Sequence, residues 1–441
     1  MRILKSQINL KIVNNTALSQ DVQILGIIAS TASANGSNAL YEFDLTGQNF
    51  TGVNSVTIEI SNTSNPTVVS YTVAVATPNI QGVVDALNTL GQGNFSYQGN
   101  IVYAPSSYYI YGDLTVSSPS LSFISNWDSS NTSPFSSALD QIQLPLNPVG
   151  TYNFVVDWGD GNTDTITSWN QTETLHTYAT AGFYTIKIDG TCIGWQFDGI
   201  GDRDKILSID SWGSLNLGNS GGYFFGCSNL DLSTVSDVLN LTGTTNLSTM
   251  FSDCTSLTTI NNINSWDMSN VIDTSIMFNN CTNFNQNLNS WDMSSVVTAV
   301  SMFKLAVAFN GDITTWDVSS LTNTANMFSG TIAFNQPIGS WNVSNVGNMD
   351  SMFIGAVGFN QDIGSWDVSN VGNFAGFMTG KSDANYSSSN LDSIYNQWSL
   401  LTLLPNVTAN FGTIKYTVAG SAGRAILTTS PNNWVIIDGG I

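Results

Sequence analysis

The sequence predicts a mainly β protein whose carboxyl half is a solenoid of stacked 25-residue coils. Tryptophans recur every 25 residues there, and two further ladders of aromatic residues keep the same interval, which is typical of repeat architectures. The acidic residues are 28 Asp against three Glu, and Asp favours turns and caps where Glu favours helices. Because the 441 residues exceed the roughly 250 to 300 that one core supports, several domains are expected.

Residues 1–117 form the first predicted domain, a β-rich unit without a chemical motif. Alternating apolar residues predict strands at 8–13, 22–27 and 56–60, and apolar residues at helical intervals predict one helix at 81–90. Polar residues interrupt the start of the chain, so we expect no secretory signal peptide. No run of about 18 apolar residues occurs, so we expect no membrane insertion.

Residues 118–202 form the second predicted domain, with strand-like segments YNFVVDW and FYTIKID around WGDG at 158–161 and HTY at 176–178. This pattern resembles a polycystic-kidney-disease (PKD) domain, a small β-sandwich with a W-x-F-G-D-G turn and a later H-T-Y. The aromatic residue before Gly-Asp-Gly is displaced in this chain. The resemblance implies that these residues fix a turn and the sandwich core, so His176 is expected to be structural.

Residues 203–380 form the third predicted domain and carry the aromatic ladders. Each unit reads Trp, Asp or Asn, Val or Met, and Ser, followed by Met-Phe, a small residue and Phe-Asn. The small position holds Cys227, Cys254 and Cys281 in earlier copies and Ala or Thr later, which predicts core side chains rather than disulfides or a zinc site. The ladder residues are Trp266, Trp291, Trp316, Trp341 and Trp366, together with Phe278, Phe303, Phe328 and Phe353.

Each unit is expected to form one coil in which a Trp-x-Val segment pairs in parallel with the next coil. The Trp and the apolar residue two positions later then point inward, and the residue between them points outward. Stacked like charges in that outward column repel, and a Ser two positions later favours an Asx turn that offsets the repulsion. A cation or ligand column is the alternative. The exposed column is Asp267, Asp292, Asp317, Asn342 and Asp367.

The unit closely resembles the BspA-like leucine-rich repeats of bacterial surface proteins, whose pattern includes W-D-V-S-N-V and M-F-x-x-A-x-x-F-N-Q-D-I. Residues 366–371 read WDVSNV, and residues 352–363 read MFIGAVGFNQDI. The resemblance implies a leucine-rich-repeat-type solenoid over 203–380. Proteins of that family are displayed adhesins, and their ligands vary.

Residues 381–441 are predicted to cap the solenoid, because the end of a repeat array needs a cover. Apolar residues at helical intervals predict a helix at 391–398, with Ser389 as its N-cap. Short apolar segments over 416–437 complete this capping region.

The sequence offers little for catalysis, so we expect no enzyme activity and no cofactor. His176 is the only histidine, and a nucleophile needs a base beside it. A calcium site is the alternative, because Asp157, Asp160 and Asp164 lie close in sequence and calcium takes oxygen ligands. A net charge of −21 with ten Lys and Arg excludes nucleic acid as a partner.

Two hypotheses of function follow. The phrases VNNT, VQILG and GVVDALNTLG within residues 1–117 are similar to amino-terminal domains of virion proteins in phages that infect Bacteroidetes. That similarity implies a homo-oligomeric fibre or decoration on the virion surface, which docks on other virion proteins through 1–117 and attaches to a host cell-surface glycan or protein. The alternative is a BspA-like adhesin on the bacterial cell surface. The expected lack of a leader favours the phage, because an adhesin must be exported.

Overall fold

The computed structural model describes residues 122–441 throughout, and before them eight strands and the helical residues Asp85 and Asn88. The chain divides into two compact units, Met1–Leu121 and Ser122–Ile441. The described chain is mainly β, which confirms the predicted class. The three domains predicted within 118–441 all fall in or at the edge of the second unit.

The described residues of the first unit form two sheets. One has five strands in the order β2-β1-β8-β4-β5, and the other has three in the order β3-β7-β6. β1, β2 and β4 overlap the strands that the sequence predicted, whereas most of the helix predicted at 81–90 lies outside the described residues. The strands are β1 (Ile8–Ile12), β2 (Val22–Gly26), β3 (Tyr41–Asp44), β4 (Ser55–Asn62), β5 (Asn65–Ala74), β6 (Ser96–Gln98), β7 (Ile101–Ala104) and β8 (Leu114–Val116).

The second unit begins with a six-stranded sheet in the order β12-β11-β14-β9-β15, with β16 paired to β14. A two-stranded sheet of β10 and β13 accompanies it. Apolar and polar residues alternate along β9 and β14, so that Phe123, Ile186 and Ile188 are buried. The elements are β9 (Phe123–Asp128), β10 (Gln141–Gln143), β11 (Leu146–Asp157), β12 (Thr163–Ile166), η1 (Thr172–Thr174), β13 (Leu175–Thr177), β14 (Phe183–Trp195), β15 (Ile206–Ser211) and β16 (Leu215–Asn216).

Strand β15 belongs both to this sheet and to the repeats that follow. It pairs antiparallel with β9, while its Ser208 forms a parallel bridge to Asp231 in the next part of the chain. The sheet therefore crosses the domain boundary that was predicted between residues 202 and 203. One hydrophobic core continues from the sheet into the repeats.

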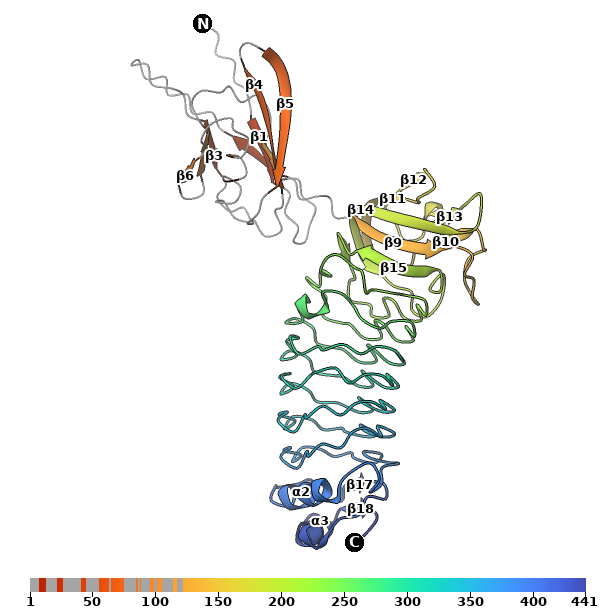
Figure 1. Ribbon diagram of the computed structural model, residues 1–441, viewed down its shortest axis with the longest axis vertical. Helices are drawn as coiled ribbons and strands as arrows, with labels where there is room; N and C mark the ends of the chain where they lie inside the picture. The colour runs from red at the N-terminus through yellow and green to blue at the C-terminus, as the bar shows by residue number, and fades with distance from the viewer. Residues whose placement is uncertain are drawn as a thin grey trace. The chain divides into compact units, whose positions relative to one another are not determined.

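Residues 203–380, called the repeat stack below, form coils that lie one on the next (Figure 1). Parallel bridges link residues at steps of 25, in the order Asp273, Thr298, Asn323, Asn348 and Asn373. The sequence placed this pairing on the Trp-x-Val segment, which is wrong. The backbone N–H of each Trp instead donates within its own coil, as from Trp316 to Ile313, so the segment is a turn and the pairing lies seven residues after the Trp.

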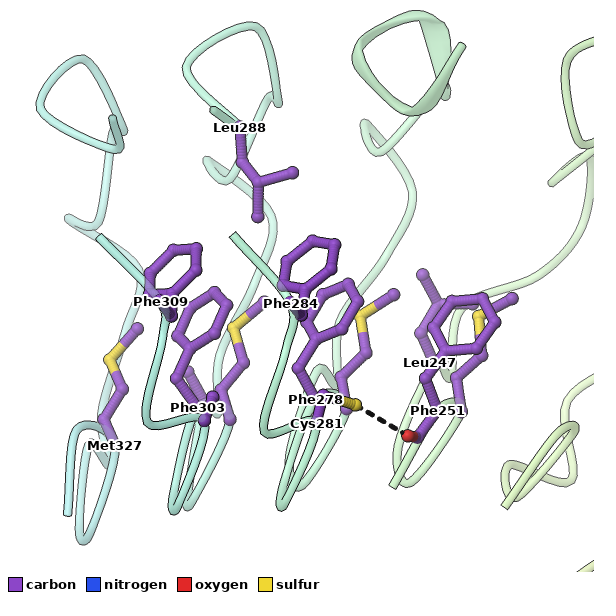
Figure 2. Packing of buried hydrophobic residues seen from close by; sticks show 14 of the residues in the cluster. Leu247, Phe251, Phe278, Cys281, Phe284, Leu288, Phe303, Phe309 and Met327 are labelled. Carbon is purple, nitrogen blue, oxygen red and sulfur yellow. Dashed lines mark hydrogen bonds between the residues drawn. The ribbon is translucent and has the colours of Figure 1, made fainter. Parts of the chain in front are cut away.

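Aromatic rings fill the interior of the stack in columns. The phenylalanines that follow Met stack from coil to coil, with ring centroids 5.6 Å apart between Phe278 and Phe303 (Figure 2). The centroids of Phe303 and Phe328 lie 5.9 Å apart. The phenylalanines of the Phe-Asn pairs form a second column beside them, 3.9 Å away between Phe303 and Phe309. The stack thus has one continuous aromatic core rather than a separate core in each repeat.

The five ladder tryptophans form a third column and are 1 to 4% exposed. Ring centroids lie 6.3 Å apart between Trp291 and Trp316. The indole N–H of each of the last four donates to a carbonyl of the preceding coil, as from Trp316 Nε1 to Leu288 O at 2.8 Å. A buried indole needs such a partner, so each Trp both fills the core and pairs two coils.

The last coil is covered by residues 381–441. Helix α2 (Ser388–Trp398) places Trp398 against Phe374, with ring centroids 5.3 Å apart. Its N-cap is Ser387, whose side chain accepts from the backbone N–H of Asn390; the prediction of Ser389 as N-cap was wrong because that residue already lies inside the helix. The other elements are β17 (Thr408–Asn410), η3 (Val418–Gly420), α3 (Ser421–Thr428) and β18 (Val435–Ile437).

Two of the few lysines lie inside the second unit. The Lys205 amino group donates to Gln141 O at 2.7 Å and lies 3.6 Å from the Asp202 carboxylate. Lys381 is 2% exposed and donates to the carbonyls of Val357 and Phe359, and burial lowers the pKa of its ammonium to about 8. These cations satisfy backbone carbonyls at the two ends of the repeat stack.

We expect Trp316→Ala to lower the free energy of unfolding by about 3 to 5 kcal/mol, because it opens a cavity in the column and removes the indole hydrogen bond to Leu288 O. The control is Trp169→Ala, because Trp169 is 43% exposed and its loss should cost less than about 1 kcal/mol. Denaturant melts of the two variants measure the difference. Equal losses would contradict the role of the tryptophan column in stability.

Candidate binding surface on the repeat stack

The five residues of the exposed column lie where the chain turns. In each coil the side-chain oxygen accepts from the backbone N–H two residues later, as from Ser294 to Asp292 at 3.0 Å and from Ser344 to Asn342 at 3.2 Å. Asp267, Asp317 and Asp367 make the same bond to Ser269, Ser319 and Ser369. All five side chains are on exposed residues. The geometry is that of an Asx turn, which needs an oxygen but no charge.

The turns also change the acidity of two members of the column, Asp292 and Asp317. Hydrogen bonds from the Ser294 hydroxyl and backbone hold the pKa of Asp292 below its ordinary value, although the charge of Asp317 works against them. The pKa of Asp317 is lowered in the same way by Ser319. Stabilisation of the charged form by local hydrogen bonds thus outweighs the repulsion between neighbouring rungs. These two rungs therefore present a stable negative charge to solvent.

A second exposed column consists of the asparagines of the Phe-Asn pairs. The side-chain oxygen of each one accepts from the backbone N–H of the equivalent residue in the next coil, and the distance is 2.9 Å from Asn335 to Asn310 and from Asn360 to Asn335. Asn285 begins this column, and at its far end Asn360 accepts from Ser387 of the cap at 2.8 Å. The repetition of Asn was visible in the sequence, but its role as a coil-to-coil clasp was not recognised there.

The cysteine column lies in the core. All four cysteines are free and buried, and burial raises the pKa of each thiol. The Cys281 sulfur donates to Phe251 O at 2.9 Å (Figure 2), and Thr331, at the same position two coils on, donates to Phe303 O at 2.7 Å. This position therefore takes a small side chain and, where that side chain has a donor, uses it to bind the preceding coil.

The WGDG and HTY motifs meet in the sheet region. The ring of His176 stacks on Trp158 with centroids 4.8 Å apart, and its Nε2 lies 2.9 Å from Asp160 Oδ2. The Tyr178 hydroxyl donates to Trp158 O at 3.0 Å. Gly159 has φ +79°, and a Cβ there would lie 2.5 Å from Thr185 O, so only glycine fits this turn.

The three aspartates that suggested a calcium site each have a separate hydrogen-bond partner. Asp157 accepts from Gly159 N, Asp160 from Asn162 N, and Asp164 from the Trp158 indole. Within the described part of the chain, no three or more His, Cys, Asp or Glu side chains are grouped so as to hold a metal ion. No helix among the described residues is long and apolar enough to cross a membrane.

Comparison with known proteins finds one family in this region. Residues 197–314, 245–343 and 291–398 each match the family described as Mycoplasma protein of unknown function, DUF285. The three matches overlap and together span 197–398, which contains the repeat stack and α2. No curated protein and no solved structure matches the chain.

We expect the double substitution of Asp292 and Asp317 by Asn to leave stability at pH 7 unchanged or slightly lower, because Asn342 already makes the same turn without a charge, while the lowered pKa values of the two carboxylates mean that their charge adds some stability. The wild-type carboxylates contribute stability above their unfolded-state pKa and lose it as the pH falls through the lowered folded pKa. The double variant should therefore lose less stability than the wild type when denaturant melts are compared at pH 5 and pH 2. A calcium-dependent rise in melting temperature that only the wild type shows would favour the cation column.

We expect Asn335→Ala to cost about 1 kcal/mol, because the backbone N–H of Asn360 loses its acceptor, while the Gln361 amide keeps the backbone carbonyl of residue 335. Asn335→Asp keeps an acceptor oxygen and should lie within about 0.5 kcal/mol of the wild type. Thermal melts of both variants test the clasp. Equal losses would mean that the asparagine column adds nothing to the pairing of coils.

Proposed function

We propose that the protein is a non-catalytic binding protein displayed on a bacterial surface, similar to the BspA-like adhesins. In this proposal residues 203–380 are a leucine-rich-repeat-type solenoid, 118–202 a PKD-like β-sandwich, 381–441 a cap and 1–117 a docking domain. The observation that carries it is the family match over 197–398, which falls on the stacked coils.

The construction of the stack supports a role in presentation. Indole and thiol groups donate to the preceding coil, and asparagine side chains accept from the next coil, so neighbouring coils are held in one register. Polar side chains at the turns then repeat at a fixed spacing over several coils. Such an array offers many equivalent weak contacts to an extended ligand, and their combination strengthens binding.

The surroundings of the reactive groups support the absence of catalysis. The four thiols are buried with raised pKa values, and a reactive cysteine needs an exposed thiolate. His176 is stacked on Trp158 and paired with Asp160, as expected for a residue that fixes the turn.

The phage hypothesis that the sequence favoured has no support from the comparisons, since the family match covers 197–398 and no curated protein or solved structure matches the chain. Of the three phrases that suggested virion proteins, VQILG forms β2, VNNT lies outside the described residues, and GVVDALNTLG does so apart from Asp85 and Asn88. The adhesin-like interpretation therefore becomes the main one.

The test is to locate the protein in the organism that carries its gene. Antibodies against residues 122–441 should label the envelope of intact cells, and external protease should remove the label without lysis. A cytosolic protein of the same organism is the control for lysis. Finding the chain only in sedimenting phage particles, or only inside cells, would overturn the proposal.

A further inference from the structure

A hollow of about 600 Å³ lies beside the sheet of the second unit. Its walls come from three segments, namely the link between β10 and β11, the loop from β12 to η1, and the segment that follows β14. The volume falls within the range of small-molecule sites, about 300 to 1,000 Å³. Neither the sequence motifs nor the repeat family accounts for it, because most of its lining precedes residue 197.

The walls are fixed by side-chain hydrogen bonds. The Gln171 amide accepts from Thr167 N at 2.7 Å and from Ser168 N at 3.0 Å, and it donates to Thr165 O, which holds the loop that carries Trp169. On the opposite side the buried Asp202 carboxylate accepts from Gln143 N at 2.6 Å. A site held in this way loses little conformational entropy when a ligand binds.

The lining combines an apolar face with unused polar groups. Trp169, Leu175 and Ile200 are 43, 38 and 57% exposed, which is unusual for three large apolar residues around one hollow. The Asn170 oxygen accepts from Ser168, but its NH₂ donates to no described protein atom, and the exposed Asp198 carboxylate accepts from none. Both donors and acceptors are therefore available beside an aromatic ring.

This chemistry fits a saccharide with no net charge. The C–H face of a sugar ring packs on an indole, whose apolar surface it removes from water, and its hydroxyls both donate to Asp198 and accept from Asn170. No Lys, Arg or His lines the hollow, which disfavours acidic ligands. A cation would prefer a cage of several exposed aromatic rings. In this hollow, Trp169 is the only exposed aromatic residue among the described residues of the lining.

We propose that this hollow is a binding site for a neutral saccharide, with Trp169 as the platform for the ring and with Asn170 and Asp198 as the polar contacts. The inference deepens the proposed binding function and rests on it for its context. It places one ligand contact beside the repeat stack rather than on it.

The test exposes the full-length chain to an array of neutral, acidic and sulfated glycans, followed by titration with the soluble form of the best neutral oligosaccharide. Trp169→Ala should weaken binding at least about tenfold, since the ring loses its apolar platform. Phe183→Ala is the matched control, because Phe183 is 77% exposed and does not line the hollow, and it should bind as the wild type does.

Asp198→Asn separates saccharide from cation. An amide oxygen still accepts from a hydroxyl, so saccharide binding should weaken by less than about tenfold, whereas binding of a cation would be abolished. Retention of no neutral glycan, retention of acidic glycans alone, or binding that Trp169→Ala leaves intact would each overturn the assignment. Envelope location without glycan binding would defeat this site alone, and absence from the envelope would defeat the proposed function alone.

Discussion

Hydrogen bonds between adjacent coils, made by the same positions in successive coils, are the constraint on which the second unit depends. Three groups from different columns each form a hydrogen bond between two adjacent coils. They are the indole of Trp316, the thiol of Cys281 and the side-chain oxygen of Asn335. An aromatic stack alone permits sliding, because van der Waals attraction has little direction. Directional bonds at a fixed interval hold every ring over its counterpart.

The scarcity of charge follows from this way of building. With 9% charged residues, turns can be closed by uncharged Asx contacts such as Ser344 to Asn342, and the two buried lysines bind backbone carbonyls. An Asn or Ser at a turn satisfies the backbone without the desolvation cost of an ion pair. The surface is consequently polar and acidic, which suits the display of hydrogen-bonding groups.

The ends of the stack are closed by elements that do not repeat. At the first end the sheet supplies β15 as the edge on which the next coil begins, and at the second end α2 covers Phe374 with Trp398. The repeat is irregular at its start. The buried Trp266 Nε1 has no hydrogen-bond partner among the described residues, whereas Trp291 Nε1 donates to Ile263 O. The regular bonding therefore begins only with the second ladder tryptophan.

The sequence by itself determined the 25-residue period and the identity of the aromatic columns, because one side chain recurring in each copy must meet one environment in each coil. Only the tertiary structure decided which backbone groups pair, since the Trp-x-Val segment turns and the bridge lies at Asp273 and its equivalents. It also decided the sharing of β15 and the hollow around Trp169. Both features depend on contacts between segments that lie far apart in the sequence. They occur in a part of the chain that does not repeat, so no periodic pattern indicates which segments are in contact.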